Sequence, residues 1–185
     1  FDALTQSIES YWSINSHYES RELSKRSIEI ILNFLKKFIF KKTKKSRLQM
    51  ALASNLSGQA INITRTTAPH ALSYVLTSYF GIPHGNAVAI LLPETFRISF
   101  HRMVNLNRPK CMKILSLFQS KDVDYFCERW INYMKACRLS TKARDFGVKP
   151  SDLEFIVNKV NYERLKGHPI ELSEADLREI VRKII

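Results

Sequence analysis

Apolar residues recur at helical spacing along most of this 185-residue chain, and that pattern constrains the fold more than any other feature. In the segment DALTQSIESYW (2–12), Leu4, Ile8 and Tyr11 fall on one face of a helix. Only five Gly and six Pro are present, which disfavours an all-β fold, because such a fold needs many tight turns. The apolar content of 45% is sufficient for one core. The sequence therefore predicts an all-α fold, a multi-helix bundle forming one domain of residues 1–185.

Capping and breaking signals divide the chain into about eight or nine expected helices. Their ranges are 2–12, 21–40, 46–62, 68–79, 86–96, 109–118, 122–136, 151–161 and 173–184. Ser20 is the expected cap of the second helix. Ser151 and Ser173 each precede an acidic residue by three positions, a pattern typical of a capping box. Residues 166–172 are expected to be a linker.

The segment NAVAILLPETF (86–96) could by itself be a buried strand or a buried helix. Its helical neighbours and small residues favour a helix, with Pro93 near its end or at a kink. Just before it, GIPHG (81–85) must break the preceding helix, because Pro83 cannot continue the hydrogen-bond ladder and glycines favour a turn. The break allows the chain to fold back on itself.

The net charge of +12 invites a nucleic-acid interpretation. Lys and Arg are concentrated in KKFIFKKTKKSR (36–47), at the end of one expected helix and in the turn after it. No nucleic-acid-binding motif accompanies that run, so a solvated basic face is favoured and no nucleic-acid partner is expected. A basic surface would also help to attract an anionic substrate.

No apolar run is long enough to span a bilayer, so no membrane partner is expected. The start, FDALTQSIES, lacks the features of a signal peptide, and its missing initiator Met is compatible with a piece of a longer chain. Cys111, Cys127 and Cys137 are odd in number and lack CxxC spacing, which argues against disulfides or a zinc–thiolate site. Reduced, buried thiols in a cytoplasmic protein are the simplest interpretation.

His70 and His84 are candidate metal ligands within HALSYVLTSYFGIPH. A straight helix of that length would be about 21 Å long, so they could share a metal only if the GIPHG break folds the chain back. Asp2 and Gln6 are four residues apart and would point from one face of the first helix. Two imidazoles and a carboxylate suit Zn²⁺ or Fe²⁺, with the Gln6 amide oxygen as a weaker, neutral ligand. On the residues alone, core histidines that bind no metal are the alternative.

The segments DALTQSIESYWS, HALSYVLTSYFGIPHG and AVAILLP together resemble the C-terminal helical domain of iron-containing (group III) alcohol dehydrogenases, a dehydroquinate synthase-like domain. The family's motifs run D-A-x-x-H-x-x-E, then H-x-x-x-H, then P-H-G followed by an apolar run to L-L-P. The resemblance implies that Asp2, Gln6, His70 and His84 stand at the metal-ligand positions. It also implies a divalent metal (Fe or Zn) and NAD(P)H as cofactors of a metal-dependent oxidoreductase.

Two positions depart from the family pattern. Gln6 stands at a ligand His, and Tyr74 stands at the second His of H-x-x-x-H, which lies near substrate and cofactor in typical members. A Gln carbonyl holds a transition metal less tightly, so loss of the metal or a different metal is an open alternative. In this respect the chain is similar to phosphonoacetaldehyde reductases, which often have Gln and Tyr at these two positions. That similarity favours a variant metal site over a site that has lost its function. Tyr74 is then a candidate catalytic residue, with a packing aromatic as the alternative.

That branch of the family implies reduction of phosphonoacetaldehyde to 2-hydroxyethylphosphonate by hydride transfer from NAD(P)H, with the metal polarising the carbonyl oxygen. Arg65, Thr66 and Thr67 are candidate substrate-binding residues, because Arg and hydroxyl donors suit a phosphonate. The alternative is a surface arginine beside two threonines that cap the next helix.

In this family an N-terminal α/β domain carries the dinucleotide-binding loop. No GxGxxG-like segment and no βαβ alternation occurs here, so that domain is expected to be absent from this chain. The chain alone is therefore expected not to catalyse the reaction. A truncated or degenerate, non-catalytic helical module is the alternative function, and nucleic-acid binding through 36–47 ranks last. A homodimer is left open.

Overall fold

The computed structural model describes residues 1–185, with eight α-helices, three short 3-10 helices and no strand. The α-helices are α1 (Asp2–Trp12), α2 (Tyr18–Phe40), α3 (Lys44–Thr64), α4 (Ala68–Phe80), α5 (His84–Leu117), α6 (Val123–Ala136), α7 (Leu153–Asn158) and α8 (Glu174–Ile184). The 3-10 helices are η1 (Ala143–Phe146), η2 (Pro150–Asp152) and η3 (Tyr162–Leu165). The predicted all-α fold is confirmed. None of the helices combines the length and the apolar character that crossing a bilayer requires.

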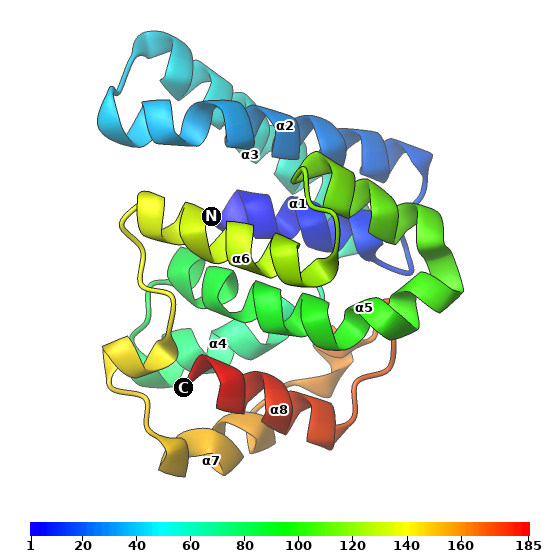
Figure 1. The fold of residues 1–185 in the computed structure, drawn as a ribbon, viewed down its shortest axis with the longest axis vertical. Helices are drawn as coiled ribbons and strands as arrows, with labels where there is room; N and C mark the ends of the chain where they lie inside the picture. The colour runs from blue at the N-terminus through cyan, green and yellow to red at the C-terminus, as the bar shows by residue number, and fades with distance from the viewer.

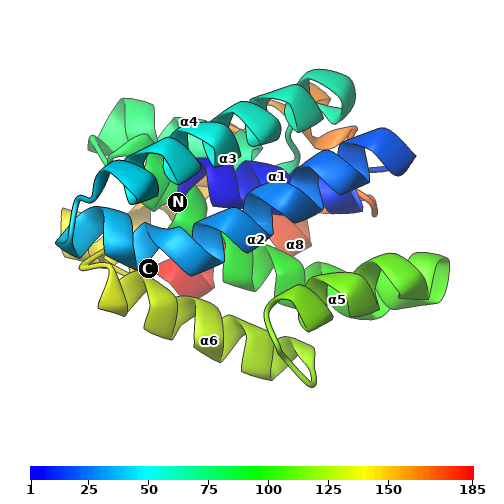
Figure 2. The same cartoon turned by 90° about the horizontal axis from the view of Figure 1, so that it is seen from above.

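Helix α1 lies in the middle of the bundle (Figure 1). It packs against the α2–α3 hairpin on one side and against α5 on the other. Helix α5 also contacts α4, α6 and α8, and α6 runs along an edge of the molecule when the bundle is seen from above (Figure 2). Because it is covered from several sides, α1 buries most of its residues, including polar ones.

A cluster of 43 buried apolar residues fills the bundle. Trp12 of α1 stacks on Phe96 of α5 with ring centroids 5.5 Å apart, and Phe96 meets Phe126 of α6 edge-on at 4.7 Å. Aromatic pairs in these geometries add stability beyond the area that they bury, so they fix α1 against α5 and α6. The three cysteines are all buried and free, as expected.

Helix α5 extends far beyond the predicted segment 86–96. The prediction that a helix ends near Pro93 is wrong, because helical structure continues past it. Pro93 has no N–H to donate to the carbonyl of Ala89, but the indole N–H of Trp130 donates to that oxygen at 2.8 Å. A contact from α6 therefore replaces the hydrogen bond that the proline removes.

Two helix boundaries also differ from the predicted ones. The predicted helix 109–118 is the last part of α5, separated from the rest only by Asn107, whose φ of −152° and ψ of 72° interrupt the helix. Helix α2 begins before Ser20, and His17 is its N-cap. Ser20 lies in the first turn, where its hydroxyl accepts the His17 N–H at 3.0 Å. The serine thus stabilises the start of the helix from within the first turn.

The C-terminal third is less helical than predicted. Helix α7 has only six residues instead of the predicted 151–161. The predicted capping role of Ser151 is wrong, because the Asp152 carboxylate accepts the Lys149 N–H at 2.8 Å and opens a 3-10 turn. The predicted cap at Ser173 is confirmed, since its hydroxyl accepts a backbone N–H in the first turn of α8.

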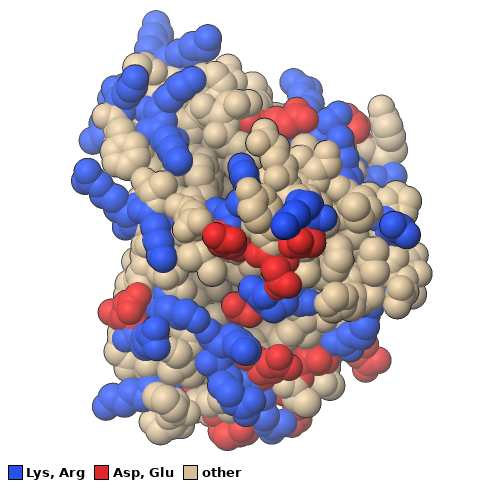
Figure 3. Space-filling model, viewed as in Figure 1, with Lys and Arg blue, Asp and Glu red and all other residues tan.

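Basic side chains gather at the tip of the α2–α3 hairpin. Figure 3 shows Lys and Arg at the upper left of the molecule, where that tip lies in the view of Figure 1. The Lys and Arg residues within 36–47 are all exposed. The run is therefore a solvated surface at one end of the bundle, and none of its residues lines the pocket that contains His70 and His84.

Candidate metal centre

Helix α1 presents Asp2, Gln6 and Glu9 on one face, because Gln6 and Glu9 follow Asp2 by four and seven residues. The Gln6 Nε2 atom donates to Asp2 Oδ2 at 3.1 Å. The Asp2 side chain is 43% exposed, whereas Glu9 is completely buried. The polar face thus runs from an open end at Asp2 into the core at Glu9.

Helix α4 carries His70 and Tyr74 one turn apart, and the break after it brings in His84. Gly81 ends α4 with a φ of +65°, a conformation that residues with a side chain rarely adopt. Pro83 then caps α5, whose first residue is His84. The ring centroids of His70 and His84 consequently lie 5.3 Å apart. The chain folds back at GIPHG and brings the two imidazoles together.

The side chains of Asp2, His70 and His84 converge. Asp2 Oδ1 lies 3.0 Å from His70 Nε2 and 3.7 Å from His84 Nε2, and the second distance is too long for a hydrogen bond. One potential ligand atom from each residue lies within 4.8 Å of the other two. Two imidazole nitrogens and a carboxylate oxygen are a donor set for Zn²⁺ or Fe²⁺, so the residues present fit such a cation.

Glu9 supports His70 from the core side. Its Oε1 atom lies 2.6 Å from His70 Nδ1, and its Oε2 atom accepts both the backbone N–H and the hydroxyl of Thr67. The Trp12 indole N–H donates to the same hydroxyl at 2.9 Å. Because Glu9 engages Nδ1, His70 Nε2 faces Asp2 and the pocket. A carboxylate in this position fixes the ring orientation of metal-binding histidines in other proteins.

Burial and charge act in opposite directions on this cluster. Burial alone would lower the pKa of His70, but the charge of Glu9 and the hydrogen bonds to Asp2 and Glu9 outweigh it and raise that pKa to about 9. Burial would raise the pKa of Asp2, yet the hydrogen bond and charge of His70 lower it. Burial lowers the pKa of His84, which keeps this imidazole neutral and its lone pair available near pH 7.

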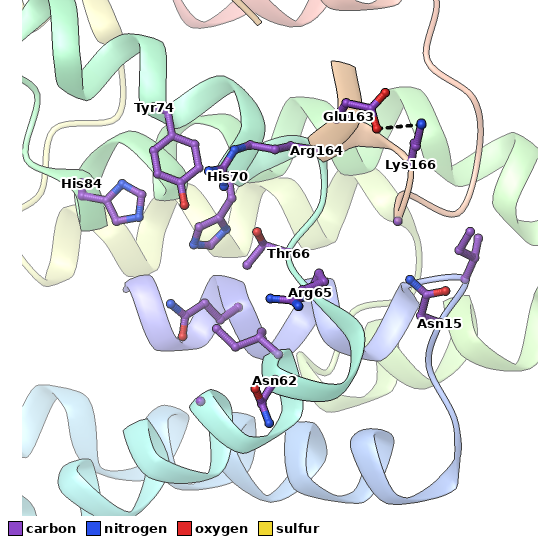
Figure 4. A pocket seen from close by; sticks show the side chains of 15 residues that line it. Asn15, Asn62, Arg65, Thr66, His70, Tyr74, His84, Glu163, Arg164 and Lys166 are labelled. Carbon is purple, nitrogen blue, oxygen red and sulfur yellow. Dashed lines mark ion pairs between the residues drawn. The ribbon is translucent and has the colours of Figure 1, made fainter. Parts of the chain in front are cut away.

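His70 and His84 lie at one end of an open pocket of about 780 Å³ (Figure 4), and Asp2 is not among the residues that line it. The Tyr74 ring stacks on His84 with centroids 5.6 Å apart, and the Arg164 guanidinium lies 4.3 Å from the centroid of the Tyr74 ring. Figure 4 shows Arg164 reaching toward His70 from the η3 segment. Tyr74 is 40% exposed, and its hydroxyl has no hydrogen-bond partner within the chain. That hydroxyl is available to a molecule in the pocket.

The pocket carries positive charge that the chain does not neutralise. Arg65 and Arg164 make no ion pair, whereas Lys166 pairs with Glu163 at 2.7 Å. Arg65 also adopts a φ of 65° and a ψ of 173°, a region that is almost restricted to glycine. Strained backbone of this kind clusters at ligand-binding positions. Two unpaired guanidinium groups favour an anionic ligand.

The structure brings most of the predicted site residues together. Besides the histidines, Gln6, Tyr74, Arg65 and Thr66 line the pocket. Thr67 does not line it, because this residue is completely buried and its hydroxyl hydrogen-bonds with Trp12 and Glu9. Its position supports His70 through Glu9.

Glu9 and Arg164 contribute to the site, although neither is among the predicted site residues. Glu9 carries a signal, since it stands at the last position of the motif D-A-x-x-H-x-x-E and follows Asp2 by two helical turns in a largely buried helix. Arg164 carries none, because its place in the pocket depends on the contact between η3 and α4, which are far apart in sequence.

An all-α domain with such a pocket has the donor groups of a metal-dependent enzyme. The chain belongs to the Fe-containing alcohol dehydrogenase family, because the model of that family's C-terminal part matches residues 1–185. It is 29% identical to long-chain-alcohol dehydrogenase 1 of Geobacillus thermodenitrificans over 97% of this chain and 47% of that protein. It is 25% identical to 1,3-propanediol dehydrogenase of Citrobacter freundii over 98% of this chain and 49% of that protein.

Solved structures share the fold. An iron-containing alcohol dehydrogenase from Thermotoga maritima aligns with a TM-score of 0.80 and 28% identity over 99% of this chain and 47% of that one. A 1,3-propanediol oxidoreductase aligns with a TM-score of 0.89 and 23% identity over the whole chain and 50% of that one. The chain therefore spans about half the length of the relatives that it matches.

Proposed function

We propose that this chain is the metal-binding C-terminal part of an NAD(P)-dependent alcohol dehydrogenase or aldehyde reductase. The observation that carries the proposal is the convergence of Asp2, His70 and His84, two of which line a basic pocket. Membership of the family and the names of its relatives as alcohol dehydrogenases support the same reaction class. When bound, a divalent metal, Fe²⁺ or Zn²⁺, would supply Lewis-acid polarisation of the substrate's carbonyl oxygen.

In this proposal the chain's own residues hold and orient the reactants. Asp2, His70 and His84 would hold the cation, with the Gln6 amide oxygen as a neutral fourth ligand. Tyr74 has a free hydroxyl beside His84, so it can hydrogen-bond the substrate's oxygen or pass a proton to the alkoxide as it forms. Excess positive charge in the pocket raises the local concentration of an anionic substrate.

The dinucleotide site belongs, in this proposal, to an N-terminal α/β domain. Dinucleotide-binding folds of that kind are built from parallel strands with a glycine-rich turn, and this chain has no strand. The matched relatives are about twice as long as this chain. When bound to that domain, NADH or NADPH would supply the hydride. The proposed location is the cytoplasm, where three buried free thiols would stay reduced.

The finer proposal is that the substrate is phosphonoacetaldehyde, which would be reduced to 2-hydroxyethylphosphonate. Arg65 and Arg164 approach the pocket from the end of α3 and from η3, and neither has an acidic partner. A phosphonate presents several acceptor oxygens to such guanidinium groups, and the Thr66 side chain adds a hydroxyl donor. An aldehyde without an anionic end leaves both charges unpaired.

The proposal is tested with the chain joined to an N-terminal α/β domain of the same family. We expect reduction of phosphonoacetaldehyde with NADH or NADPH, and no turnover by the 185-residue chain alone. Arg164→Gln should lower kcat/KM for the phosphonate by about tenfold to a hundredfold, the effect of removing one charge-assisted hydrogen bond, and should leave propionaldehyde nearly unaffected. Arg182→Gln, an exposed change on α8, is the matched control. Full activity of the 185-residue chain alone would contradict the proposal that the dinucleotide site lies in another domain. Equal losses of kcat/KM with both aldehydes would contradict the proposal of a phosphonate substrate.

A further inference from the structure

The Gln6 amide has two partners that fix its orientation. Its Nε2 atom donates to Asp2 Oδ2 at 3.1 Å, and its Oε1 atom accepts the Ser57 hydroxyl at 3.0 Å. The nitrogen end thus faces the Asp2, His70 and His84 cluster. An amide nitrogen has no lone pair free to bind a cation, so Gln6 can act as a ligand only after its amide turns over.

The Ser57 hydroxyl is able to accommodate that turn. Ser57 is completely buried on α3, and its Oγ atom lies within hydrogen-bond distance of two acceptors, Gln6 Oε1 and the carbonyl oxygen of Ala3 at 2.9 Å. A hydroxyl has one proton but also accepts hydrogen bonds, so it can serve only one of these acceptors at a time. When it donates to Ala3, its oxygen is free to accept the Gln6 NH₂ group.

We propose that Ser57 is a positioning residue that decides which end of the Gln6 amide faces the metal cluster. Without a cation, Ser57 donates to Gln6 and the NH₂ group faces Asp2. With a cation, Ser57 donates to Ala3 and accepts from Gln6, whose carbonyl oxygen then faces the cation. The inference rests on the metal binding in the proposed function, and it concerns a residue that contacts no ligand atom of the three-residue cluster.

Both arrangements leave the buried polar atoms satisfied. Ser57 donates one hydrogen bond in each, and the Gln6 nitrogen always has an acceptor, either Asp2 or Ser57. In the second arrangement Asp2 loses the Gln6 contact, but its side chain is 43% exposed and can reach water or the cation. The switch therefore does not leave a buried donor or acceptor unpaired, which is the usual penalty for reorienting an amide.

The test compares the Zn²⁺ affinity of the metal-stripped chain with that of its variants by titration calorimetry. We expect Ser57→Ala to weaken Zn²⁺ binding by about tenfold, as changes behind a metal ligand typically do. In a Gln6→His background, Ser57→Ala should have little effect on affinity, because an imidazole ligand has no amide to orient. Ser24→Ala is the matched control, since its hydroxyl is also completely buried but has no hydrogen-bond partner in the chain.

Wild-type chain gives a second readout that requires no variant to fold. The side-chain NH₂ resonances of Gln6, assigned through Gln6→Glu, should shift on Zn²⁺ addition as their acceptor changes from a carboxylate to a hydroxyl. No Zn²⁺ binding by the wild type would contradict the proposed function itself. Zn²⁺ binding with an unmoved Gln6 resonance, or equal losses from Ser57→Ala in both backgrounds, would overturn the role of Ser57 and leave the metal site standing.

Discussion

Replacement of Glu9 by Gln tests the support behind His70. Glu9 is completely buried and accepts from His70 Nδ1 and from both the N–H and the hydroxyl of Thr67. A Gln side chain has the same shape but one acceptor oxygen, so its NH₂ group must face at least one donor. The Thr67 hydroxyl can rotate to accept from it, but the His70 and Thr67 N–H groups cannot both keep their partner.

The size of the effect follows from the hydrogen bonds that the substitution removes. A hydrogen bond to a charged group contributes about 1.5–3 kcal/mol, and one such bond disappears outright, so Glu9→Gln should lower the free energy of unfolding by about 2–3 kcal/mol. Metal affinity should fall by about tenfold to a hundredfold, because His70 is deprived of the carboxylate that orients it.

Urea unfolding followed by the fluorescence of the two buried tryptophans measures the stability, and Zn²⁺ titration calorimetry measures the affinity. Glu29→Gln is the matched control, since Glu29 is exposed on α2 and makes no ion pair. A stability change below about 0.5 kcal/mol, the size typical of surface substitutions, together with unchanged Zn²⁺ affinity would refute the reasoning.

Three further changes probe how the bundle is held together, each measured by urea unfolding. Trp130→Phe keeps an aromatic ring but removes the N–H that satisfies the Ala89 carbonyl beside Pro93, so it should cost about 1–3 kcal/mol. Gly81→Ala should cost about 1–2 kcal/mol because φ is +65°, and Gly58→Ala, where an added Cβ meets nothing, should cost nothing or stabilise α3. Burial and the charge of Arg102 lower the pKa of His168 to about 3, so folding favours its neutral form. The unfolding free energy should then fall by up to about 1.4 kcal/mol per pH unit below pH 6.5, and His168→Phe should flatten this part of the curve. If the unfolding free energy of His168→Phe falls as steeply with decreasing pH as that of the wild type, His168 is not the source of this pH dependence.

Local signals are enough to predict the class of fold and most of the helices. The Ser173 cap and the Gly81 break work through neighbouring residues, and both act in the structure as the sequence indicates. The prediction that a helix ends near Pro93 fails because Trp130, a residue on another helix, donates the hydrogen bond that the proline cannot. The prediction for Ser151 fails because Asp152 competes for the same role one position later. The pattern of apolar residues predicts neither which of two neighbouring residues caps a helix nor which distant residue replaces a missing hydrogen bond.

The site residues likewise fall into those that the sequence predicts and those that it does not. Spacing and the family motifs predict Asp2, His70 and His84, and the fold places one ligand atom of each within 4.8 Å of the others. The family motif marks Glu9 but does not say which partner its carboxylate binds, and Ser57 could not be assigned from sequence, because a serine in a helix has many uses. Their roles come from contacts between α1, α3 and α4, which only the packed bundle specifies.

The metal content and Zn²⁺ affinity of the purified chain decide whether the cluster of Asp2, His70 and His84 is a metal centre. We expect about one equivalent of Fe or Zn by elemental analysis, or one Zn²⁺ site by calorimetry after metal removal. His84→Ala should abolish most of this binding, since it removes one of three converging ligands. His101→Ala, an exposed histidine on α5 outside the pocket, should bind as the wild type does. A chain that binds no metal, or that binds it equally well after His84→Ala, would show that the cluster is not a metal centre.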